Sequence, residues 1–299
     1  MRNNSGIVSE GGRALLIINP IAGLQKSRAV ERLIEAAGGG PWPLTVVRTQ
    51  KAGDARQAAA DAPEETAVII AAGGDGTINE AICGMRRRDI PLGIVPFGTA
   101  NLLAGEFGIP GDIRKACELI YRGQWRAVDL GETEKGCFLA VGGAGFDAAV
   151  VHRFASLRKG NVTFASYLQP VVETMVSYPF PRITVELDGE RVTDDATAVI
   201  IANTRRYGGP FVLTPDAKPD DGLFDVCIFD SANAGIYGAH MTAALLQSSS
   251  KLPGVWVFRA KSVKCSSGRQ VPVQLDGDPH GYLPATFEIL PGAVKLIAP

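Results

Sequence analysis

The fold of this chain is decided by residues 67–80, which read Ala-Val-Ile-Ile-Ala-Ala-Gly-Gly-Asp-Gly-Thr-Ile-Asn-Glu. The first six residues are apolar, and a short apolar run predicts a buried strand. The glycine-rich turn that follows leads into a helical pattern from Ile78. A strand, a turn and a helix in this order are typical of an open α/β sheet, which binds its ligands at the carboxyl ends of its strands.

The turn at 73–77 has the chemistry of an anion site. Its glycines let backbone N–H groups approach an anion closely, and the N-terminus of the next helix adds partial positive charge. Thr77 and Glu80 have capping-box spacing, an alternative that explains those two residues but not Asp75. An acid here is explained if a cation or a polarised hydroxyl shares the site. The turn has neither the P-loop lysine nor G-x-G-x-x-G spacing, so P-loop kinases and dehydrogenases of the G-x-G-x-x-G type are disfavoured.

This turn lies within a β-α alternation. Apolar runs at 14–18, 44–48 and 92–95 are separated by helical patterns. Alternation with short connections predicts a parallel sheet covered by helices. Turns at 19–23 and 97–101 follow two of these strands, so we expect three glycine-bearing loops to converge on one edge of the sheet.

The pattern changes near Gln124. Long stretches beyond it resemble antiparallel strands, and Asp188-Gly189 between two of them is a strong hairpin signal. We therefore expect an N-terminal α/β domain over residues 1–127, completed by a returning strand at 288–299. A β-rich domain is expected over 128–287.

Composition narrows the function classes. Thirty Lys and Arg residues face 31 Asp and Glu residues, whereas proteins that grip a nucleic-acid backbone carry a basic excess. No apolar run approaches the ~18 residues that a membrane-spanning helix needs. Residues 1–13 are polar, carry no secretory signal and are expected to be a flexible lead. We expect a cytoplasmic protein with no nucleic-acid partner and no transmembrane segment.

Several motifs give the chain a family resemblance. They are NPIAG (19–23), GGDGTINE (73–80), PFGTANLLA (96–104), VDLGE (128–132), GGAGFDA (142–148), PDAKPDDGLFD (215–225) and LDGD (275–278). In order and spacing they resemble the diacylglycerol kinase catalytic-domain family, which includes bacterial diacylglycerol kinases and sphingosine kinases and is distantly related to NAD kinases. The resemblance implies an N-terminal α/β nucleotide-binding domain, a C-terminal β-sandwich-like domain and an active site in the cleft between them.

The resemblance implies that the N-terminal domain binds ATP with Mg²⁺. The matching positions are Asn19, Pro20, Gly23, Thr49, Asp54, Gly73, Gly74, Asp75, Gly76, Thr77, Asn79, Glu80, Gly98, Thr99 and Asn101. Among them, Asp75 matches an acid that works with magnesium at the phosphates. Asp54 has an alternative explanation, because an Asp at this place is also a good helix N-cap.

The catalytic residues that the resemblance implies are Asp75, Asp129, Asp276 and Asp278. Asp278 stands where the family usually has the glutamate that accepts the proton, so the carboxylate is one methylene shorter. Asp276 could take over, or a water could bridge. The residues alone also allow Asp129 to be a surface strand acid and Asp276-Gly277 to be an ordinary hairpin turn.

A structural Mg²⁺ is implied at the main-chain carbonyls of Lys218 and Leu223 and the carboxylate of Asp221. Hard oxygen ligands suit this ion. The alternative is again ordinary turn chemistry, because Asp-Asp-Gly is common in turns.

The resemblance implies an ATP-dependent kinase that phosphorylates a lipid hydroxyl, such as that of diacylglycerol, at a membrane surface. A lipid substrate implies that the protein associates transiently with the membrane surface. A homodimer is compatible with this activity. An apolar stripe, made of Phe146, Phe154, Phe164, Tyr167 and Leu168, fits either the core or a lipid groove. The alternatives are an NAD kinase-like enzyme for a soluble nucleotide and a nucleotide-binding regulator with little catalysis.

Overall fold

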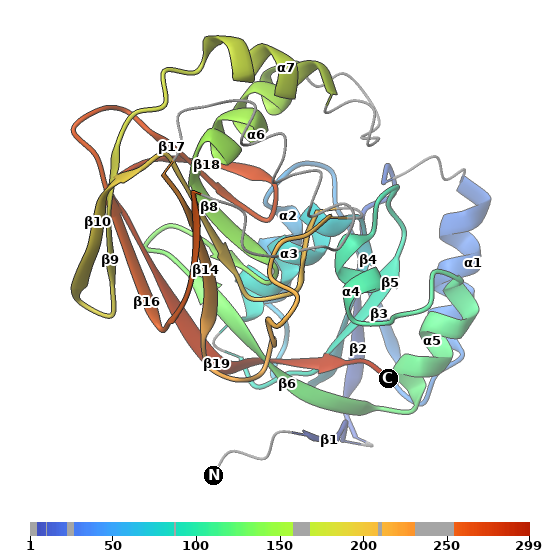
Figure 1. The fold of residues 1–299 in the computed structure, drawn as a ribbon. Coiled ribbons are helices and arrows are strands. Elements are labelled where there is room, and N and C mark those ends of the chain that lie inside the picture. Colours follow the sequence, from blue (N-terminus) through green and yellow to red (C-terminus); the bar gives the residue numbers. More distant parts are fainter. Residues whose placement is uncertain are drawn as a thin grey trace. The chain divides into compact units, whose positions relative to one another are not determined.

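The computed structural model describes residues 5–9, 11–22, 27–86, 88–157, 168–208, 211–230 and 254–299. The chain forms two compact units, the first made of Met1–Val128 with Gly292–Pro299 and the second of Asp129–Pro291. It enters the second unit along β6 (Gln124–Glu132) and leaves it along β19 (Ala285–Ile297) (Figure 1). None of the helices within these residues combines the length and the apolar character that crossing a bilayer requires.

The first unit is built on a parallel sheet. Its strands run in the order β3 (Leu44–Arg48), β2 (Arg13–Ile18), β4 (Thr66–Gly73), β5 (Leu92–Pro96) and the end of β19. Every residue of β4 and β5 is buried, because helices cover both faces of the sheet.

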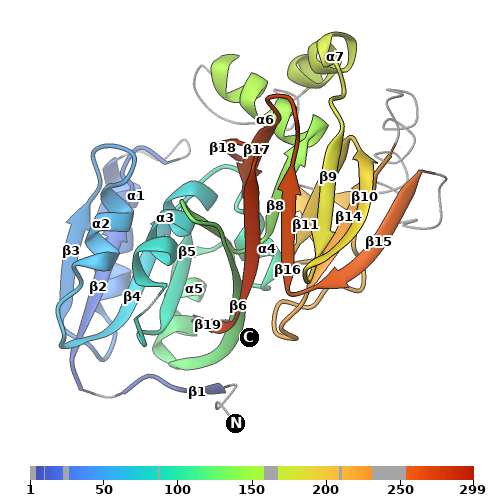
Figure 2. The same ribbon diagram turned by 90° about the vertical axis from the view of Figure 1, so that its left-hand side faces the viewer.

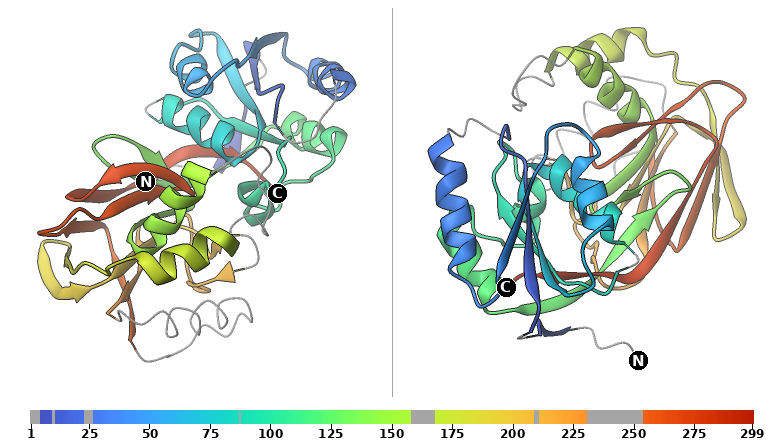
Figure 3. Two further views of the ribbon diagram at one scale, coloured as in Figure 1. Left: turned by 90° about the horizontal axis from the view of Figure 1, so that it is seen from above. Right: turned by 180° about the vertical axis from the view of Figure 1, so that it is seen from behind.

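The helices of this unit confirm the β-α alternation that the sequence predicts. Figure 3 shows α1 (Ser27–Gly38) and α5 (Ile113–Tyr121) on one side of the sheet, with α2 (Asp54–Ala60) and α3 (Asp75–Met85) on the other. The short α4 (Leu102–Glu106) follows β5. Asp112 caps α5, since its Oδ1 accepts a hydrogen bond from the Lys115 N–H at 3.0 Å.

The N-terminal residues differ from the prediction of a flexible lead. Ser5–Ile7 forms β1, which pairs antiparallel with β6, and Ser5 lies opposite Arg126. The pairing satisfies backbone groups of both segments.

The second unit is a sandwich of antiparallel strands (Figure 2). One layer has the order β10 (Glu190–Ala196), β9 (Ile183–Leu187), β16 (Ser262–Ser266) and the first part of β19. The other has the order β15 (Val255–Ala260), β14 (Phe224–Phe229), β11 (Ala198–Ala202), β8 (Val141–Gly145), β17 (Pro272–Leu275) and β18 (Asp278–Tyr282). In addition, β7 (Cys137–Phe138) pairs with β6, and β12 (Arg206–Gly208) pairs with β13 (Phe211–Val212).

Aromatic side chains fill the space between the two layers. The rings of Phe138 and Phe224 stack at 5.5 Å, and Phe287 meets Phe138 edge-on at 6.2 Å. All three are fully buried within one apolar cluster that draws on both layers. The predicted fold class, an α/β unit followed by a β-sandwich-like unit, is confirmed.

Two helices, α6 (Phe146–Leu157) and α7 (Leu168–Ser177), cover the outer face of the β8-containing layer. Phe146 and Phe154 are each only 6% exposed, and Phe146 stacks on Phe180 at 5.4 Å. These two members of the apolar stripe therefore belong to the core. Phe164, Tyr167 and the side chain of Leu168 lie outside the described residues.

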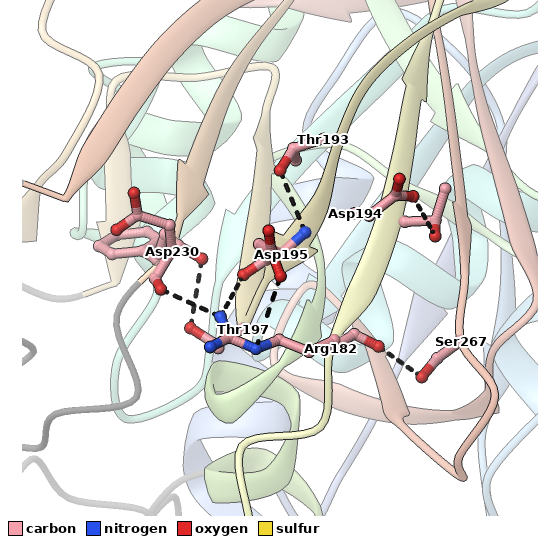
Figure 4. Close-up of polar contacts among 9 residues, drawn as sticks. Arg182, Thr193, Asp194, Asp195, Thr197, Asp230 and Ser267 are labelled. Carbon is pink, nitrogen blue, oxygen red and sulfur yellow. Dashed lines mark hydrogen bonds and ion pairs between the residues drawn. The ribbon is translucent and has the colours of Figure 1, made fainter.

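A polar network ties the two layers together at one end (Figure 4). Arg182, just before β9, donates to the carbonyl of Asp195 in β10 at 2.7 Å and to that of Asp230 after β14 at 3.3 Å. Ser267 donates in turn to the carbonyl of Arg182 at 2.6 Å. The acceptors are backbone carbonyls, so these contacts hold β10, the end of β14 and the segment after β16 around Arg182.

The hairpin predicted at Asp188-Gly189 is confirmed. Leu187 pairs with Glu190 across a two-residue turn, and both turn residues have positive φ, 50° for Asp188 and 87° for Gly189. Two positive φ values define the type I′ turn, whose twist matches that of the strands it joins.

Candidate functional site

The three glycine-bearing turns of the first unit meet at the carboxyl edge of its sheet. A Cβ on Gly98 would lie 2.4 Å from the Cα of Gly74, so the turns after β4 and β5 pack backbone against backbone. The turn after β2 joins them through Asn19, whose Nδ2 donates to Thr77 Oγ1 at 3.1 Å. The predicted convergence is therefore present in the structure.

The N-terminus of α3 faces this edge with a glycine as its cap. The cap residue, Gly74, is extended and has no side chain to pair with the first N–H groups of the helix. Asp75 follows at the first helical position, half-buried, and its Oδ1 accepts a hydrogen bond from the Leu103 N–H at 2.9 Å. Asp75 thus links the GGDGT turn to the segment after β5, and the helix end provides the partial positive charge that favours an anion.

Glu80 does not complete the capping box that its spacing suggested. The helix begins at Asp75, so Thr77 lies inside it and its hydroxyl accepts from Asn19 instead. The carboxylate of Glu80 accepts hydrogen bonds from the N–H groups of Gly53 at 2.8 Å and Ala55 at 3.3 Å. It therefore stabilises the N-terminus of α2.

Asp54 is the first residue of α2 rather than its N-cap, which is Gly53. Its Oδ2 accepts hydrogen bonds from the N–H groups of Gln50 at 2.8 Å and Lys51 at 3.0 Å. These bonds, first that of Gln50, hold the pKa of Asp54 below its usual range. The carboxylate closes the loop that follows Thr49. Thr49 itself is buried, and its N–H donates a hydrogen bond to the carbonyl of Ile18.

Asn101 shapes the turn after β5. Its Oδ1 accepts from the Gly98 N–H and its Nδ2 donates to the Gly98 carbonyl, both at 2.9 Å. The residue has a φ of 48° and caps α4. Thr99, between these two residues, is exposed at the tip of the turn.

The remaining nucleotide candidates lie around the same turns. Gly73 ends β4, where a Cβ would lie 2.5 Å from that of Thr77, and Asn79 is buried within α3. Pro20 is half-buried in the turn after β2, and Gly76 is exposed. Gly23 lies outside the described residues.

Asp276, in the second unit, is held by the backbone. Its carboxylate accepts three hydrogen bonds, from Leu139 N–H at 2.7 Å, Ala140 N–H at 2.9 Å and Val141 N–H at 2.8 Å. Its own N–H donates to the Val141 carbonyl at 2.8 Å. Asp276 therefore fastens the β17–β18 hairpin onto the segment that leads into β8.

The turn of this hairpin is Asp276-Gly277, with φ of 47° and 81°, and it is also of type I′. Asp278 is the first residue of β18, lies opposite Leu275 and is exposed. The two acids thus differ: the hydrogen bonds of Asp276 build the turn, and Asp278 stands at its end. Asp75 belongs to the first unit, whereas Asp129, Asp276 and Asp278 belong to the second.

Asp129 is buried, at 2% exposure, so it is not a surface strand acid. Its Oδ2 accepts from the Gly222 N–H at 2.6 Å, and its own N–H donates to the Pro219 carbonyl at 2.7 Å. Its carbonyl accepts from Asn203 Nδ2 at 2.9 Å. Asp129 holds the 218–223 turn in place, and a catalytic role for it stays a prediction.

The carboxylate of Asp221 already has two partners. Its Oδ1 accepts from the Leu223 N–H at 3.2 Å, and its Oδ2 pairs with the guanidinium of Arg259. Arg259 Nε also lies 3.9 Å from Asp225 Oδ2. Burial raises the pKa of Asp225, and the charge of Arg259 opposes that shift.

Two carbonyls and one carboxylate are ligand types that Mg²⁺ accepts, so the Lys218–Asp221–Leu223 turn fits the ion chemically. A cation there would compete with Arg259 for Asp221. Among the described residues, no three His, Cys, Asp or Glu side chains gather into a metal-binding group.

The prediction missed a buried pair that joins Asp147 of the GGAGFDA segment to Gln274 of β17. Asp147 is 7% exposed and Gln274 3% exposed, and Gln274 Nε2 donates to Asp147 Oδ2 at 3.0 Å. Burial raises the pKa of Asp147 to about 7, and the Gln274 bond acts in the opposite direction. An acid next to glycines at the start of an apolar helix was the available signal.

Comparison with protein families assigns both halves of the chain. Residues 13–133 match the model of the diacylglycerol kinase catalytic domain. Residues 140–298 match the model of the YegS C-terminal NAD kinase beta sandwich-like domain.

Similar proteins extend over nearly the whole chain. A diacylglycerol kinase of Staphylococcus carnosus (strain TM300) is 32% identical over 292 residues, which cover 96% of this chain and 95% of that protein. One of Staphylococcus aureus (strain JH9) is also 32% identical, with 92% of its length covered.

Solved structures show the same fold. A diacylglycerol kinase from Bacillus anthracis str. Sterne aligns with a TM-score of 0.73 and 22% identity over 97% of this chain and 98% of the other. A second structure from that organism aligns with a TM-score of 0.80 and 24% identity, covering 97% and 99%. The motifs, the architecture and these relatives agree, and the chain belongs to the diacylglycerol kinase family.

Proposed function

We propose that this protein is an ATP-dependent lipid kinase, which transfers the γ-phosphoryl group of ATP to a lipid hydroxyl such as that of diacylglycerol. The observation that carries the proposal is the backbone packing of Gly74 against Gly98 beside the N-terminus of α3. Such an edge suits phosphate groups, because backbone N–H groups and a helix end converge without intervening side chains. The diacylglycerol kinases of Staphylococcus, which share 32% identity, support a lipid acceptor.

Mg²⁺ bound with ATP would offset the charge on the β- and γ-phosphate oxygens. Asp75 fits this role by its chemistry, since it is an oxygen donor, half-buried at the turn and fixed through its Oδ1 by Leu103. The residues of this chain then hold the triphosphate in line with the attacking hydroxyl. Phosphoryl transfer depends mostly on such positioning and charge stabilisation.

Asp278 is the proton acceptor in this proposal. The lipid hydroxyl oxygen forms a bond to the γ-phosphorus, the bond from that phosphorus to the β–γ bridging oxygen breaks, and ADP leaves with the electron pair. The hydroxyl proton goes to the Asp278 carboxylate. Asp276 is less suited to this step, because its carboxylate already accepts three backbone hydrogen bonds.

The test is transfer from γ-labelled ATP in the presence of Mg²⁺ to a panel of acceptors. The panel contains dispersed diacylglycerol, phosphatidylglycerol, a long-chain base and NAD. We expect a labelled lipid, and we expect Asp75→Ala to abolish labelling while circular dichroism shows an unchanged fold. Labelling of NAD but of no lipid would replace the proposal with an NAD kinase-like activity.

A regulator with little catalysis predicts a different result. It would bind ATP and label no acceptor, and Asp278→Glu would create the missing transfer. Our proposal extends to a cytoplasmic location with transient contact to a membrane surface. Sedimentation with diacylglycerol-containing vesicles tests that contact, and light scattering tests for a homodimer.

A further inference from the structure

The buried acid Asp147 calls for an explanation, because an ionisable group is costly to bury unless a partner compensates it. It is the second residue of α6, and that helix follows directly from β8 at the centre of a sandwich layer. Its side chain points back toward β17, where Gln274 donates to it. An apolar side chain could be buried here at a lower cost in free energy, so packing alone does not explain the carboxyl group.

The contact continues beyond Gln274 to the hairpin turn that carries Asp278. The Gly277 N–H donates to Gln274 Oε1 at 2.9 Å. A backbone N–H can only donate, so the oxygen of the Gln274 amide must face the turn and its nitrogen must face Asp147. Asp147 Oδ2 is then the acceptor that fixes this amide, and the three residues form one directed relay.

The sheet leaves room for this relay at one glycine. Gly143 lies directly opposite Gln274 in the β8–β17 pairing. A Cβ at position 143 would lie 2.7 Å from Asp147 Oδ2 and 3.1 Å from Gln274 Nε2. Gly143 and Asp147 of the GGAGFDA segment therefore serve the same contact.

We propose that Asp147 is a positioning residue for phosphoryl transfer, which acts through Gln274 to hold the Asp276-Gly277 turn and so sets the place of Asp278. The inference rests on the proposed function, because it gives Asp278 the role of proton acceptor. Displacement of a reacting group by about 1 Å can cost about a hundredfold in rate. The relay fixes the turn from the side of the buried helix, while Asp276 fixes it from the side of residues 139–141.

The first experiment measures the turn itself, with no need for catalysis. Hydrogen exchange of the 272–282 segment is followed by mass spectrometry in the full chain and in two variants, Asp147→Leu and Gln274→Met. Both replacements keep the side chain close to its original size and remove the relay. We expect about tenfold faster exchange at the turn in each, with melting curves showing that both variants fold.

The second experiment measures transfer to dispersed diacylglycerol. We expect kcat to fall about tenfold to hundredfold in both variants, with the KM for ATP unchanged. The double variant should be no slower than the single ones, because the residues act in one relay. Asp147→Asn keeps an acceptor for Gln274 and should retain kcat within about twofold.

His152→Phe is the matched control. His152 also joins α6 to the β17–β18 hairpin, since its Nε2 lies 2.8 Å from the Val273 carbonyl and its ring lies 5.4 Å from that of Tyr282, but neither contact is with the Asp276-Gly277 turn. We expect it to leave exchange at residues 276–278 and kcat unchanged. An equal loss in His152→Phe would overturn the inference, because the loss would then come from detachment of α6 alone.

The two proposals fail in distinguishable ways. If the unaltered chain labels no lipid, the proposed function fails, and exchange at the turn still tests the relay. If exchange at 272–282 is the same with and without Asp147, the relay is overturned whatever the activity. If the turn loosens but kcat stays at the level of the unaltered chain, positioning by Asp147 is overturned while the kinase assignment stands.

Discussion

Two Asp-Gly turns of the second unit, Asp188-Gly189 and Asp276-Gly277, have the same backbone and different surroundings. Both join antiparallel strands as type I′ turns, with all four φ values between 47° and 87°. In both, the aspartate uses its N–H and its carboxylate to dock onto a third segment. Asp188 does so at Lys261 and Ser262, where each N–H donates to its Oδ1 at 2.9 Å.

The two turns differ in the hydrogen-bond partner of the glycine N–H. The Gly277 N–H meets Gln274, which is anchored in turn by the buried Asp147. Within the part of the chain that the structure describes, no side chain accepts a hydrogen bond from Gly189. The Asp-Gly dipeptide and its docking aspartate therefore give both turns the same shape, and the buried partner Gln274 distinguishes the turn that we assign to catalysis.

The residue after each turn gives the largest expected contrast. Asp278→Ala should lower kcat for lipid phosphorylation by about a thousandfold, because general base catalysis contributes about 10²- to 10⁴-fold. Glu190→Ala, at the equivalent place after the other turn, should leave kcat within about twofold. Steady-state assays on both variants check this, and a small effect at Asp278 would erase the distinction between the turns.

The buried acid Asp147 should make the free energy of unfolding depend on pH. Burial raises the pKa of Asp147 from 3.8 to about 7, so the folded chain holds this proton more tightly than the unfolded chain does. The free energy of unfolding therefore falls as the pH rises from about 4 to about 7, by at most about 4 kcal/mol from this group.

We accordingly expect Asp147→Asn to be more stable than the unaltered chain at pH 8, with the advantage disappearing near pH 4. Urea unfolding at both values and at pH 6 measures the difference. A stability difference that is flat across this range would mean that Asp147 is not the buried titrating acid described here.

The docking aspartates should differ in stability. Asp276→Ala removes three backbone hydrogen bonds to a carboxylate and is expected to cost about 3 kcal/mol. Asp188→Ala removes two at an exposed turn and should cost about 1.5 kcal/mol. Urea unfolding curves measure both, and equal costs would show that the two turns are docked equally firmly.

The second unit has a third Asp-Gly pair, Asp221-Gly222, for which we expect the smallest effect. Its carboxylate pairs with Arg259, which competes with any cation at the 218–223 turn. Arg259→Met should tighten Mg²⁺ binding by about tenfold, measured by calorimetry in Mg²⁺ solution. Arg191→Met, which removes the exposed partner of Asp194, is the control. Unchanged affinity would argue against Asp221 as a ligand.

Local patterns predicted the elements well and the side-chain partners poorly. The GGDGT turn, its converging neighbours and the Asp188-Gly189 hairpin follow from turn chemistry within a few residues. The capping box at Thr77 and Glu80 did not form, because α3 begins earlier, at Asp75, and Glu80 reaches α2 instead. The partners of Asp54 likewise precede it in the loop rather than follow it in the helix.

The relay could not be predicted for a related reason. Asp147 and Gln274 are far apart in the chain, and they meet only because β8 and β17 pair in one register that puts Gly143 opposite Gln274. Arg259 meets Asp221 through a similar long-range pairing of β14 with β15. Contacts fixed by sheet register are set by the whole fold and leave little local signal.

The strand β19 has a consequence for how the molecule is made. Its first half pairs with β16 in the second unit, and its end pairs with β5 in the first, where Leu296 and Ile297 are almost fully buried. The first unit is thus made of two separate stretches of sequence, because the whole second unit is inserted between them. While the ribosome is still making residues 129–291, the early sheet lacks its last strand and exposes the edge of β5. That edge is most vulnerable to proteases and to wrong pairing until residues beyond 291 emerge.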